Sequence, residues 1–478
     1  MKRVFNGLHF YININNLNGI IKDDEGNHDD LRRTFHALNT FTAAMEKYAD
    51  EFEDVEVEKF TTSRLHFYIP IDNNSEDVLN EMLELIAFAH ALTKHINKHS
   101  KYQALIDFKI GAGADYGKYT DFNFEDPDSG LEEMTTIGSP ANRAAKLQSL
   151  CSDGKVLISK EVYDLLPQSM NDLFFGNSEA TLILIRKYAD LSAYEADVTD
   201  IGSRLGDKYN KRKDYCLDYA SAVINNLNLN DMEISDAKSK LNFDSLSIKN
   251  TKDVREASVL FADIRGFTKK VDESNLSDMK QLTQSVLGML NKEVRNRNGV
   301  HVQFQGDRES AIFNKYSDET DDYVLRAVLC AMRMFDKLDE INKTREDKLN
   351  IGIGCSIGEV YAARIGMRGK KFNVAMGQIV KEADTAEDDV AGVGVGYNHF
   401  KSEIAITSDM YDYLVALQNN DSKYIKECFW RREVNNKRYY ISTTRLSAYQ
   451  KKKQVESLEQ NSMRAHNNQG LKPWGCNN

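Results

Sequence analysis

The sequence has little that would connect it to a membrane or an oxidising compartment. It has no run of about 18 uninterrupted apolar residues, so no membrane-spanning helix is predicted. The start, MKRVFNGLHFYINI, has only short apolar runs broken by asparagine, which indicates a β-strand rather than a signal peptide. Proline occurs 5 times and cysteine 6 times. The cysteines form no CxxC pair, which favours reduced thiols in a cytoplasmic protein over disulfides or a zinc site.

The net charge and the composition further restrict the class of protein. The net charge is −11, so we expect no nucleic-acid partner and no binding to anionic lipid. A negative net charge does not exclude a local basic pocket that binds phosphate. Hydrophobic residues make up 41% of the chain and charged residues 28%, which is typical of a globular protein. A globular chain of 478 residues is too long for one typical domain and predicts two or three.

A weak internal repeat runs through the chain. Five segments of the first half recur in the same order about 240 to 250 residues later. The pairs are HFYININ (9–15) with VLFADIR (259–265), VEVEKFTTSRLHFYI (55–69) with GVHVQFQGDRESAIF (299–313), IGAGADYG (110–117) with IGIGCSIG (351–358), IGSPANRAAK (137–146) with MGQIVKEADT (376–385), and VLISKEVYDLL (156–166) with IAITSDMYDYL (404–414). A repeat of this length indicates two copies of one domain rather than a solenoid.

Within each copy, short apolar strands alternate with long amphipathic helices, as in LSDMKQLTQSVLGMLNKEVRN (276–296). The order resembles β-α-β-β-α-β and predicts an α+β fold, with helices on one face of a mainly antiparallel sheet. We expect domains at 1–197 and 250–449 and a linker with one helix at 198–249. Residues 450–478 lack an apolar face and are expected to form a solvated tail.

Two carboxylates stand out in the second copy. The strand VLFADIRGFT carries Asp263 near its end, and the hairpin QFQGDRESAIF presents Asp307 at its tip. Carboxylates at strand ends beside a helix start can hold hard cations, and the first amides of the helix can hold a phosphate chain. A pair of metal ions at such a place suits in-line attack at phosphorus.

The combination of FADIRGFT and QGD resembles the class III adenylate and guanylate cyclases, most clearly over residues 255–365. The resemblance implies two tandem ferredoxin-like cyclase domains that form an intramolecular head-to-tail pseudo-dimer. It implies two divalent cations, Mg²⁺ or Mn²⁺, at Asp263, Ile264 and Asp307, and substrate contacts at Phe267 and Thr268.

In that family the partner domain supplies an Asn and an Arg four residues apart on a helix. The matching residues here are Asn142, which would position the ribose, and Lys146, which would stabilise the transition state. Lysine keeps the charge but loses the planar fork of arginine. Arg143 would point about 100° away along the helix, so Lys146 is preferred. Arg186 falls near the position of a phosphate-binding lysine of the family.

The two copies have lost complementary residues. The first copy has Asn13 and Ser63 where the second has Asp263 and Asp307, and the second has Lys381 and Thr385 at the positions of Asn142 and Lys146. This pattern predicts one working site and one degenerate site between two domains that face each other.

The positions that read the base in the family correspond to Val57 and Thr135, and neither purine signature is present. The absent purine signature and the absence of a sensor domain resemble the bacterial Pycsar antiphage cyclases. This second resemblance implies a cyclase that converts CTP or UTP to the 3′,5′-cyclic monophosphate plus pyrophosphate, and a separate effector protein that senses the product. Thr135 does not distinguish CTP from UTP, because its hydroxyl can either donate or accept a hydrogen bond at the edge of the base.

Two other functions stay open from the sequence. The first is an adenylate or guanylate cyclase of ordinary signalling, which Glu58 or Lys59 pointing into the site would favour. The second is a non-catalytic nucleotide-binding regulator. The complementary half-sites argue against it.

Overall fold

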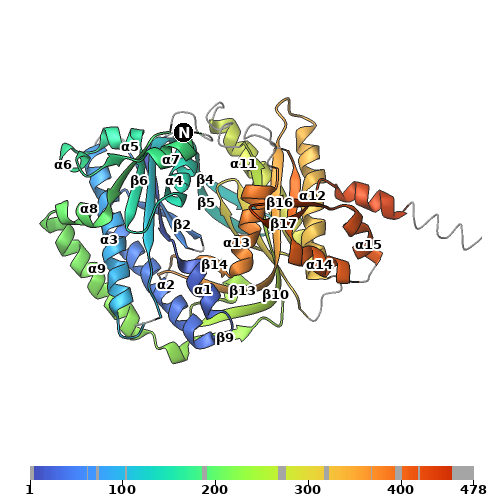
Figure 1. Cartoon of the computed structure of the whole chain (residues 1–478), viewed down its shortest axis with the longest axis horizontal. Coiled ribbons are helices and arrows are strands. Elements are labelled where there is room, and N and C mark those ends of the chain that lie inside the picture. Colours follow the sequence, from blue (N-terminus) through green and yellow to red (C-terminus); the bar gives the residue numbers. More distant parts are fainter. Residues whose placement is uncertain are drawn as a thin grey trace, which may run out of the picture.

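The computed structural model describes residues 5–61, 63–71, 75–102, 105–185, 191–266, 276–316, 322–367, 369–392, 401–417 and 420–454. In this part of the chain the molecule has two halves, each built on one mixed sheet (Figure 1). The N-terminal half, coloured blue to green, lies beside the C-terminal half, coloured yellow to red. The predicted α+β architecture with two tandem domains is confirmed.

The N-terminal sheet has the strand order β2-β3-β1-β4-β6-β8-β7, with β5 paired to β4. β1 is antiparallel to both β3 and β4, and β4 is parallel to β6. The strands are β1 (Phe5–Ile14), β2 (Glu56–Thr61), β3 (Arg64–Pro70), β4 (Ile110–Asp126), β5 (Leu131–Gly138), β6 (Lys155–Ser159), β7 (Phe175–Gly176) and β8 (Ala193–Asp197).

Helices α2 and α3 pack against one another and bury apolar residues against this sheet. The Asn27 side chain accepts from two backbone amides at the start of α2, which satisfies groups that the helix itself leaves open. The helices of this half are α1 (Leu17–Asp24), α2 (His28–Ala49), α3 (Ser75–Lys98), α4 (Ser139–Ser149), α5 (Lys160–Leu165), α6 (Gln168–Asn171), α7 (Ser178–Leu184), α8 (Val198–Arg204) and α9 (Asp207–Asn226).

The C-terminal sheet repeats this topology. Its order is β11-β12-β10-β13-β15-β17-β16, with β14 paired to β13 and β9 paired in parallel to β10. The strands are β9 (Glu233–Asp236), β10 (Asn250–Arg265), β11 (Val300–Gln305), β12 (Arg308–Asn314), β13 (Asn350–Ile365), β14 (Phe372–Met376), β15 (Glu403–Thr407), β16 (Trp430–Val434) and β17 (Lys437–Ser442).

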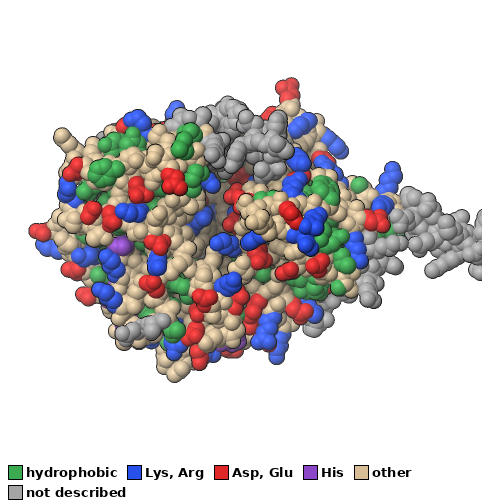
Figure 2. Space-filling model, viewed as in Figure 1, with side chains coloured by type: hydrophobic (Ala, Val, Ile, Leu, Met, Phe, Trp, Pro, Cys, Tyr) green, Lys and Arg blue, Asp and Glu red, His purple; other side chains and the backbone are tan. Residues whose placement is uncertain are grey.

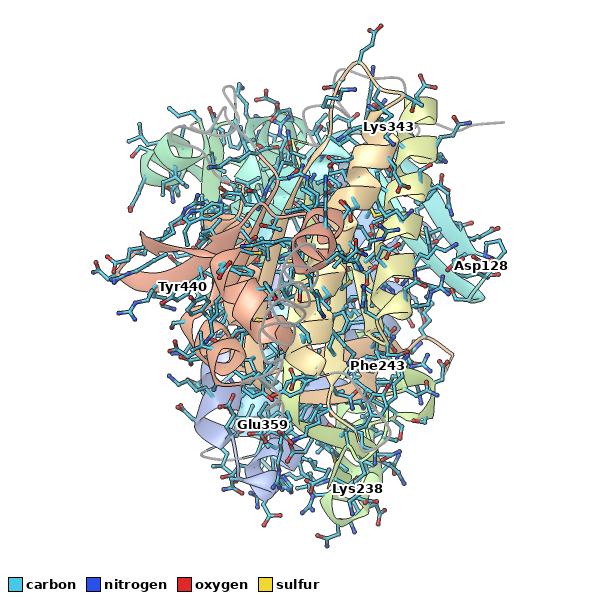
Figure 3. The ribbon with its side chains drawn as sticks, turned by 90° about the vertical axis from the view of Figure 1, so that its right-hand side faces the viewer. Asp128, Lys238, Phe243, Lys343, Glu359 and Tyr440 are labelled. Carbon is cyan, nitrogen blue, oxygen red and sulfur yellow. The ribbon has the colours of Figure 1, made fainter. Side chains whose placement is uncertain are left out.

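Helices α11 and α12 pack together on this sheet (Figure 3). A short π-helical turn, η3, directly follows α13. The helices of this half are α11 (Leu276–Asn296), α12 (Tyr323–Asn342), α13 (Gln378–Thr385), η3 (Ala386–Val390), α14 (Ser408–Ala416) and α15 (Asn420–Glu427). Two 3-10 turns, η1 (Leu229–Asp231) and η2 (Phe243–Ser245), lie between α9 and β10.

The segment predicted as a linker contains the predicted helix, α9, but this helix is part of the N-terminal fold. Tyr209, Cys216, Ala220 and Ile224 are buried in the core that α2 and α3 share with the N-terminal sheet. Their spacing of four or seven residues places them on one face of the helix. The polar residues that suggested a linker lie on the other faces of α9.

A hairpin of each half reaches into the core of the other half. β4 and β5 extend beyond the N-terminal sheet, and Phe122, Phe124 and Ile137 are buried in the C-terminal core. The Phe124 and Phe304 rings lie 4.7 Å apart in an edge-on arrangement, which suits aromatic pairs. Figure 3 shows this hairpin beside α11, with Asp128 labelled near its tip; the Lys292 ammonium of α11 lies 3.4 Å from the Asp128 carboxylate.

The equivalent hairpin of the C-terminal half, β13 and β14, enters the N-terminal core in the same way. Tyr361, Ala363, Ile365, Val374 and Met376 are buried there. The exchange of hairpins is reciprocal, so the two domains are related as the head-to-tail pseudo-dimer requires.

None of the helices in the described ranges combines the length and the apolar character that crossing a bilayer requires. The cysteines among the described residues form no disulfide: Cys151, Cys216, Cys330, Cys355 and Cys428.

Candidate active site

Asp263 and Asp307 are brought together at one end of the C-terminal sheet. Asp263 lies near the end of β10, where it pairs in register with Arg308 of β12 on one side and Gly352 of β13 on the other. Asp307 directly precedes β12 in the turn after β11. Gly306 adopts a φ of 67° in this turn, a conformation that side chains rarely take and that lets the hairpin present Asp307 beside Asp263.

The electrostatics of this pair favour a bound cation. The Asp263 side chain is 27% exposed, and Asp307 is buried. Burial, followed by the negative charge of Asp263, raises the pKa of Asp307 well above its usual value. The Asp307 Oδ2 atom is buried and has no hydrogen-bond partner among the described residues. Two close carboxylates with a buried oxygen of this kind fit a divalent metal ion.

Ile264, the third predicted metal-binding residue, directly follows Asp263 on β10. Its side chain is buried in the C-terminal core and has no metal-binding atom, so only its backbone oxygen can serve as a ligand. Within the described ranges, His, Cys, Asp and Glu side chains form no group of three or more that could hold a metal. Two carboxylates completed by backbone, water and phosphate oxygens are an arrangement that suits Mg²⁺.

Two arginines and a glutamate, which the sequence reasoning did not identify, surround the aspartates. The Arg265 Nη1 atom lies 3.6 Å from Asp263 Oδ2, and its Nη2 atom lies 2.7 Å from Glu387 Oε1. The Arg308 Nη2 atom lies 2.8 Å from Glu387 Oε2 and 2.6 Å from Asp384 Oδ1. Burial raises the pKa of Glu387, and the charges of Arg308 and Arg265 oppose this rise. The sequence contains one indication of the two arginines, which is that each closely follows a predicted metal aspartate, and it contains none of Glu387.

Asn142 and Lys146 lie one turn apart on α4, as predicted, and both are partly exposed. The charge of Lys146 acts on Asp389 of η3: burial and Asp388 raise the pKa of Asp389, and Lys146 lowers it. Since η3 also carries Glu387, this interaction places Lys146 across from the segment that borders the aspartates. Figure 2 shows a hollow between the two halves, with acidic side chains on the wall formed by the C-terminal half.

Arg143, the neighbour of Asn142, faces the N-terminal domain. Its Nε atom lies 3.1 Å from Asp115 Oδ2, and its Nη2 donates to Glu161 Oε1 at 2.9 Å. This direction agrees with the angle that the helical spacing predicts. Lys146 rather than Arg143 is therefore the cation of α4 that faces the C-terminal half.

The predicted base-reading positions lie at the contact between β2 and β5. Thr135 is fully buried, and its hydroxyl donates to Glu58 Oε1 at 2.9 Å. Thr136 donates to Glu58 Oε2 at 2.6 Å, and His66 Nδ1 lies 3.0 Å from the same oxygen. Val57 packs instead against the N-terminal core. The polar partner of Thr135 is thus Glu58, one residue after the position predicted from the sequence.

Lys59, the other charged residue at this place, belongs to the interface between the halves. Its ammonium donates to the Phe304 carbonyl at 2.7 Å and to Glu133 Oε1 at 3.2 Å. Glu133 also accepts from the Phe304 amide at 2.9 Å. Both charged side chains near the base-reading positions are therefore engaged with protein groups. Arg186, Phe267 and Thr268 lie outside the described residues.

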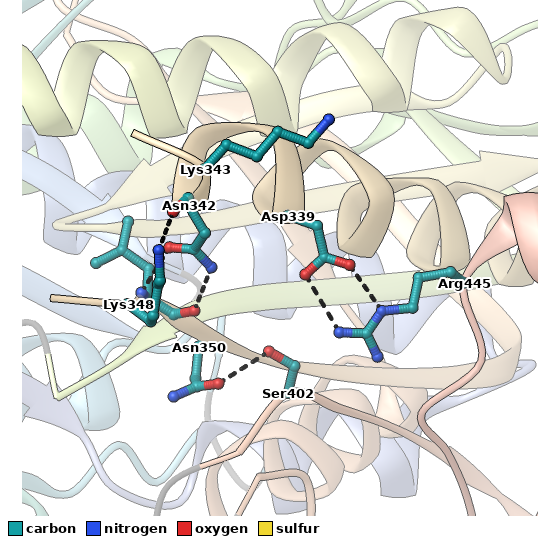
Figure 4. A pocket seen from close by; sticks show the side chains of 8 residues that line it. Asp339, Asn342, Lys343, Lys348, Asn350, Ser402 and Arg445 are labelled. Carbon is teal, nitrogen blue, oxygen red and sulfur yellow. Dashed lines mark hydrogen bonds and ion pairs between the residues drawn. The ribbon is translucent and has the colours of Figure 1, made fainter. Parts of the chain in front are cut away.

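A surface pocket is visible at the end of α12 (Figure 4). Its polar groups satisfy one another: Arg445 is paired with Asp339 at 2.9 Å, and Ser402 donates to Asn350 at 3.4 Å. This pocket contains neither the aspartates nor the α4 residues.

The fold agrees with the comparisons to known proteins. Residues 249–435 match the family of adenylate and guanylate cyclase catalytic domains. This match lies in the C-terminal half of the chain, and the resemblance predicted from FADIRGFT and QGD is confirmed. A class III adenylyl cyclase-like ATP-binding protein from Pseudomonas aeruginosa superposes with a TM-score of 0.69 at 19% identity, over 94% of this chain and 90% of that one. This likeness shows the tandem fold.

Among curated relatives, a uridylate cyclase of a Rhizobium species is 26% identical over 396 residues, which cover 76% of this chain and 72% of the relative. A uridylate cyclase of Burkholderia cepacia is 28% identical over 145 residues, 29% of this chain and 61% of the relative. An adenylate cyclase of Anabaena cylindrica is 24% identical over 138 residues, 28% of this chain and 27% of the relative. The relatives therefore include both pyrimidine and purine cyclases.

Proposed function

We propose that the chain is a pyrimidine nucleotide cyclase that converts CTP or UTP to the 3′,5′-cyclic monophosphate and pyrophosphate. The observation that carries a cyclase reaction is the convergence of Asp263 and Asp307 beside η3, the segment on which Lys146 of the other half acts electrostatically. The match to the Rhizobium uridylate cyclase over 396 residues, across most of both chains, supports a pyrimidine substrate.

In the proposed reaction the ribose 3′-hydroxyl gives its proton to water, and its oxygen bonds to the α-phosphorus while the bond from that phosphorus to the bridging oxygen of pyrophosphate breaks. Two divalent cations at Asp263, the Ile264 backbone and Asp307 would lower the barrier by neutralising phosphate charge. Lys146 would balance the charge that builds on the transferring phosphoryl group, and Asn142 would orient the ribose.

The polar side chains at the predicted base-reading positions are all bonded to protein groups. Lys59 is bonded to Glu133 and the Phe304 carbonyl, and Glu58 is bonded to Thr135, Thr136 and His66. A base of either kind needs partners for its polar edge atoms, because a buried donor or acceptor left unpaired costs about 1–3 kcal/mol. Reading any base here would therefore require one of these interactions to open, and the pyrimidine substrate is supported by the match to the Rhizobium uridylate cyclase.

A guanylate cyclase is the second candidate, and one observation favours it. Glu58 is a carboxylate next to the predicted reading position Thr135, and a carboxylate can accept from the N–H groups of guanine. This candidate requires Glu58 to turn from the two threonines toward the base.

The experiment that separates these candidates is incubation of the purified chain with each of the four nucleoside triphosphates in Mg²⁺ and in Mn²⁺, with products identified by mass spectrometry. Cyclic CMP or cyclic UMP as the dominant product supports the proposal, and cyclic GMP or cyclic AMP replaces it with a purine cyclase. A Lys146→Met variant run in parallel tests the α4 contribution. Nucleotide binding without any product would instead support a non-catalytic regulator.

We also propose that the product is a second messenger in antiviral defence, sensed by a separate effector protein. This role rests on the resemblance to the Pycsar cyclases. Its test is to measure cyclic CMP and cyclic UMP in bacteria that express the chain, before and after phage infection. An unchanged level in infected cells would contradict the defence role and leave the cyclase proposal standing.

A further inference from the structure

A buried ion-pair cluster joins the metal aspartates to η3. Glu387 is 2% exposed, and each of its carboxylate oxygens faces a different arginine: Oε1 lies 2.7 Å from Arg265 Nη2, and Oε2 lies 2.8 Å from Arg308 Nη2. Arg265 is 6% exposed, and its guanidinium also donates to the backbone carbonyls of Glu387 and Ala391. The carboxylate is thus attracted by a guanidinium group on each side, although Glu387 Oε1 and Arg308 Nη2 make no hydrogen bond of good geometry among the described residues.

Both arginines lie next to the aspartates that are proposed to bind metal. Arg265 follows Asp263 by two residues, so their side chains lie on the same face of β10. Arg308 directly follows Asp307 and pairs across the sheet with Asp263. An arginine without a countercharge at either place would compete with a cation for the aspartate oxygens. Glu387 supplies that countercharge to both.

The backbone of β13 makes room for this cluster. A Cβ atom on Gly352 would lie 1.9 Å from Arg265 Nη2. A Cβ atom on Gly354 would lie 2.2 Å from the Ala383 carbonyl oxygen and 2.3 Å from the Glu387 amide nitrogen. Both contacts are far shorter than any side chain tolerates. The two glycines therefore let Arg265 and the end of α13 approach the strand.

The N-terminal copy repeats this packing with amides in place of Arg265 and Glu387, while Arg64 keeps the position of Arg308. A Cβ atom on Gly113 would lie 2.1 Å from the Gln148 amide nitrogen and 2.6 Å from the Ala144 carbonyl oxygen, the same contacts as at Gly354. Gln148 thus occupies the place of Glu387, and Asn15 occupies the place of Arg265. The Gln148 amide donates to the Asn15 side chain at 3.3 Å.

The difference between the copies follows the metal aspartates. In the copy with the neutral Asn15–Gln148 pair, the aspartate positions hold Asn13 and Ser63, and Asn13 donates to Asn15 at 2.9 Å. The fold is therefore satisfied by a pair of amides at this place. The charged pair occurs in the copy that carries both aspartates, so the charges serve the site rather than the packing.

We propose that Glu387 is a positioning residue for the metal site. It pairs with Arg265 at 2.7 Å and with Arg308 at 2.8 Å, so that Arg265 stays at the longer distance of 3.6 Å from Asp263 Oδ2 and the aspartate oxygens remain accessible to a cation. This inference rests on the proposed metal-dependent function. It adds η3 and Glu387 to the elements on which that function depends.

The test is Mn²⁺ binding to the nucleotide-free, full-length protein, followed by electron paramagnetic resonance, which does not require turnover. An Asp307→Asn variant defines the binding that belongs to this site. Glu387→Gln should weaken that binding by about 10- to 100-fold, as is usual when a residue that orients a ligand is replaced. The matched control is Glu382→Gln, the same change on α13, where the carboxylate contacts Ser356 and Gln378 instead. It should bind Mn²⁺ like the parent.

A second variant keeps the test decisive where Glu387→Gln unfolds. The double variant Arg265→Asn with Glu387→Gln installs the amide pair of the N-terminal copy and should fold. It removes one competing cation, Arg265, and leaves Arg308 without Glu387. Its Mn²⁺ affinity should therefore lie between those of the parent and of Glu387→Gln. Parent-like Mn²⁺ binding in either folded variant would overturn the proposal, even if the chain is a cyclase. Parent protein without Asp307-dependent Mn²⁺ binding would overturn it as well. The absence of any cyclic product, with weakened Mn²⁺ binding in the variants, would reject the proposed function and leave Glu387 as a positioning residue.

Discussion

The Glu133 carboxylate of β5 lies 3.0 Å from Nε2 of His301 on β11, so the two domains meet through a largely buried charged contact, with side chains 20% and 10% exposed. The other ring nitrogen of His301, Nδ1, lies 2.7 Å from Glu309 Oε1. The imidazole is thus placed between one carboxylate of each half. Burial opposes the charged ring, but the two glutamates outweigh it and raise the pKa of His301 to about 10.

This arrangement predicts a specific pH dependence of stability. The pKa of His301 is raised above the ordinary value of about 6.5 that it has in the unfolded chain. Its contribution to the free energy of unfolding is therefore fully present below about pH 6.5 and is lost as the pH rises towards 10. His301→Gln leaves Glu133 and Glu309 without their shared cation. We expect it to destabilise the protein by roughly 3–5 kcal/mol at pH 6, because breaking a buried ion pair strands the remaining charge.

The measurement is urea denaturation of the parent and the variant at pH 6, 8 and 9.5. The gap between their free energies of unfolding should shrink as the pH rises. A gap that is constant across this range would show that His301 is not charged in the folded protein.

Replacing Asp307 with asparagine should abolish most catalysis and leave the fold intact. Asparagine keeps the shape of the turn but removes a charge that a metal ion requires, and each ion contributes several kcal/mol to the transition state. We expect turnover to fall by orders of magnitude and thermal stability to hold or rise, since the repulsion with Asp263 is removed. Cyclisation at the parent rate by folded Asp307→Asn, in Mg²⁺ or Mn²⁺, would refute the assignment.

Replacing Thr135 with valine tests the base-reading position. The change removes a hydroxyl that donates to Glu58, at the position that the sequence resemblance predicts to read the base. We expect the ratio of the rates with CTP, UTP, ATP and GTP to change. The control is Thr136→Val, which also removes a hydrogen bond to Glu58. Equal changes of the ratios in the two variants would place the reading function on Glu58 rather than on Thr135.

Separating the halves should inactivate both, and mixing them should restore part of the activity. The cut must keep α9 with the N-terminal half, because Cys216, Ala220 and Ile224 are buried in that core. We therefore expect a fragment of residues 1–228 to unfold at a higher temperature than one of residues 1–200. The measurement is thermal unfolding of each fragment, and then cyclase activity of 1–228 mixed with 229–478. Full activity of 229–478 alone would exclude a site shared between the halves.

The sequence predicted the features that depend on local patterns. The aspartates follow from two short motifs, and the helical spacing on α4 separated Lys146 from Arg143. The position next to Thr135 was assigned to Val57, with Glu58 named only as an alternative, because β2 contains a bulge between Val57 and Lys59. One extra residue in a strand moves the next side chain to the other face, so an alignment that counts residues selects Val57 where the structure places Glu58.

The Arg265–Glu387 pair was missed for another reason. These residues are far apart in the sequence, and a charge on a helix end is ordinarily a solvated group. Their meeting depends on Gly352 and Gly354, whose missing side chains the sequence shows only as a glycine-rich strand. Likewise, α9 was interpreted as a linker because its few apolar residues are diluted by charges, although they occupy a single face.

The exchange of hairpins within one polypeptide has a consequence for how the proposed enzyme responds to dilution. A cyclase assembled from two separate chains loses its site when its concentration falls below the dissociation constant of the dimer. Here the covalent connection through α9 and β9 fixes the effective concentration of one half for the other. The rate per molecule is therefore expected to be the same at nanomolar and micromolar protein, so a cell with very few copies would hold as large a fraction of assembled sites as one with many.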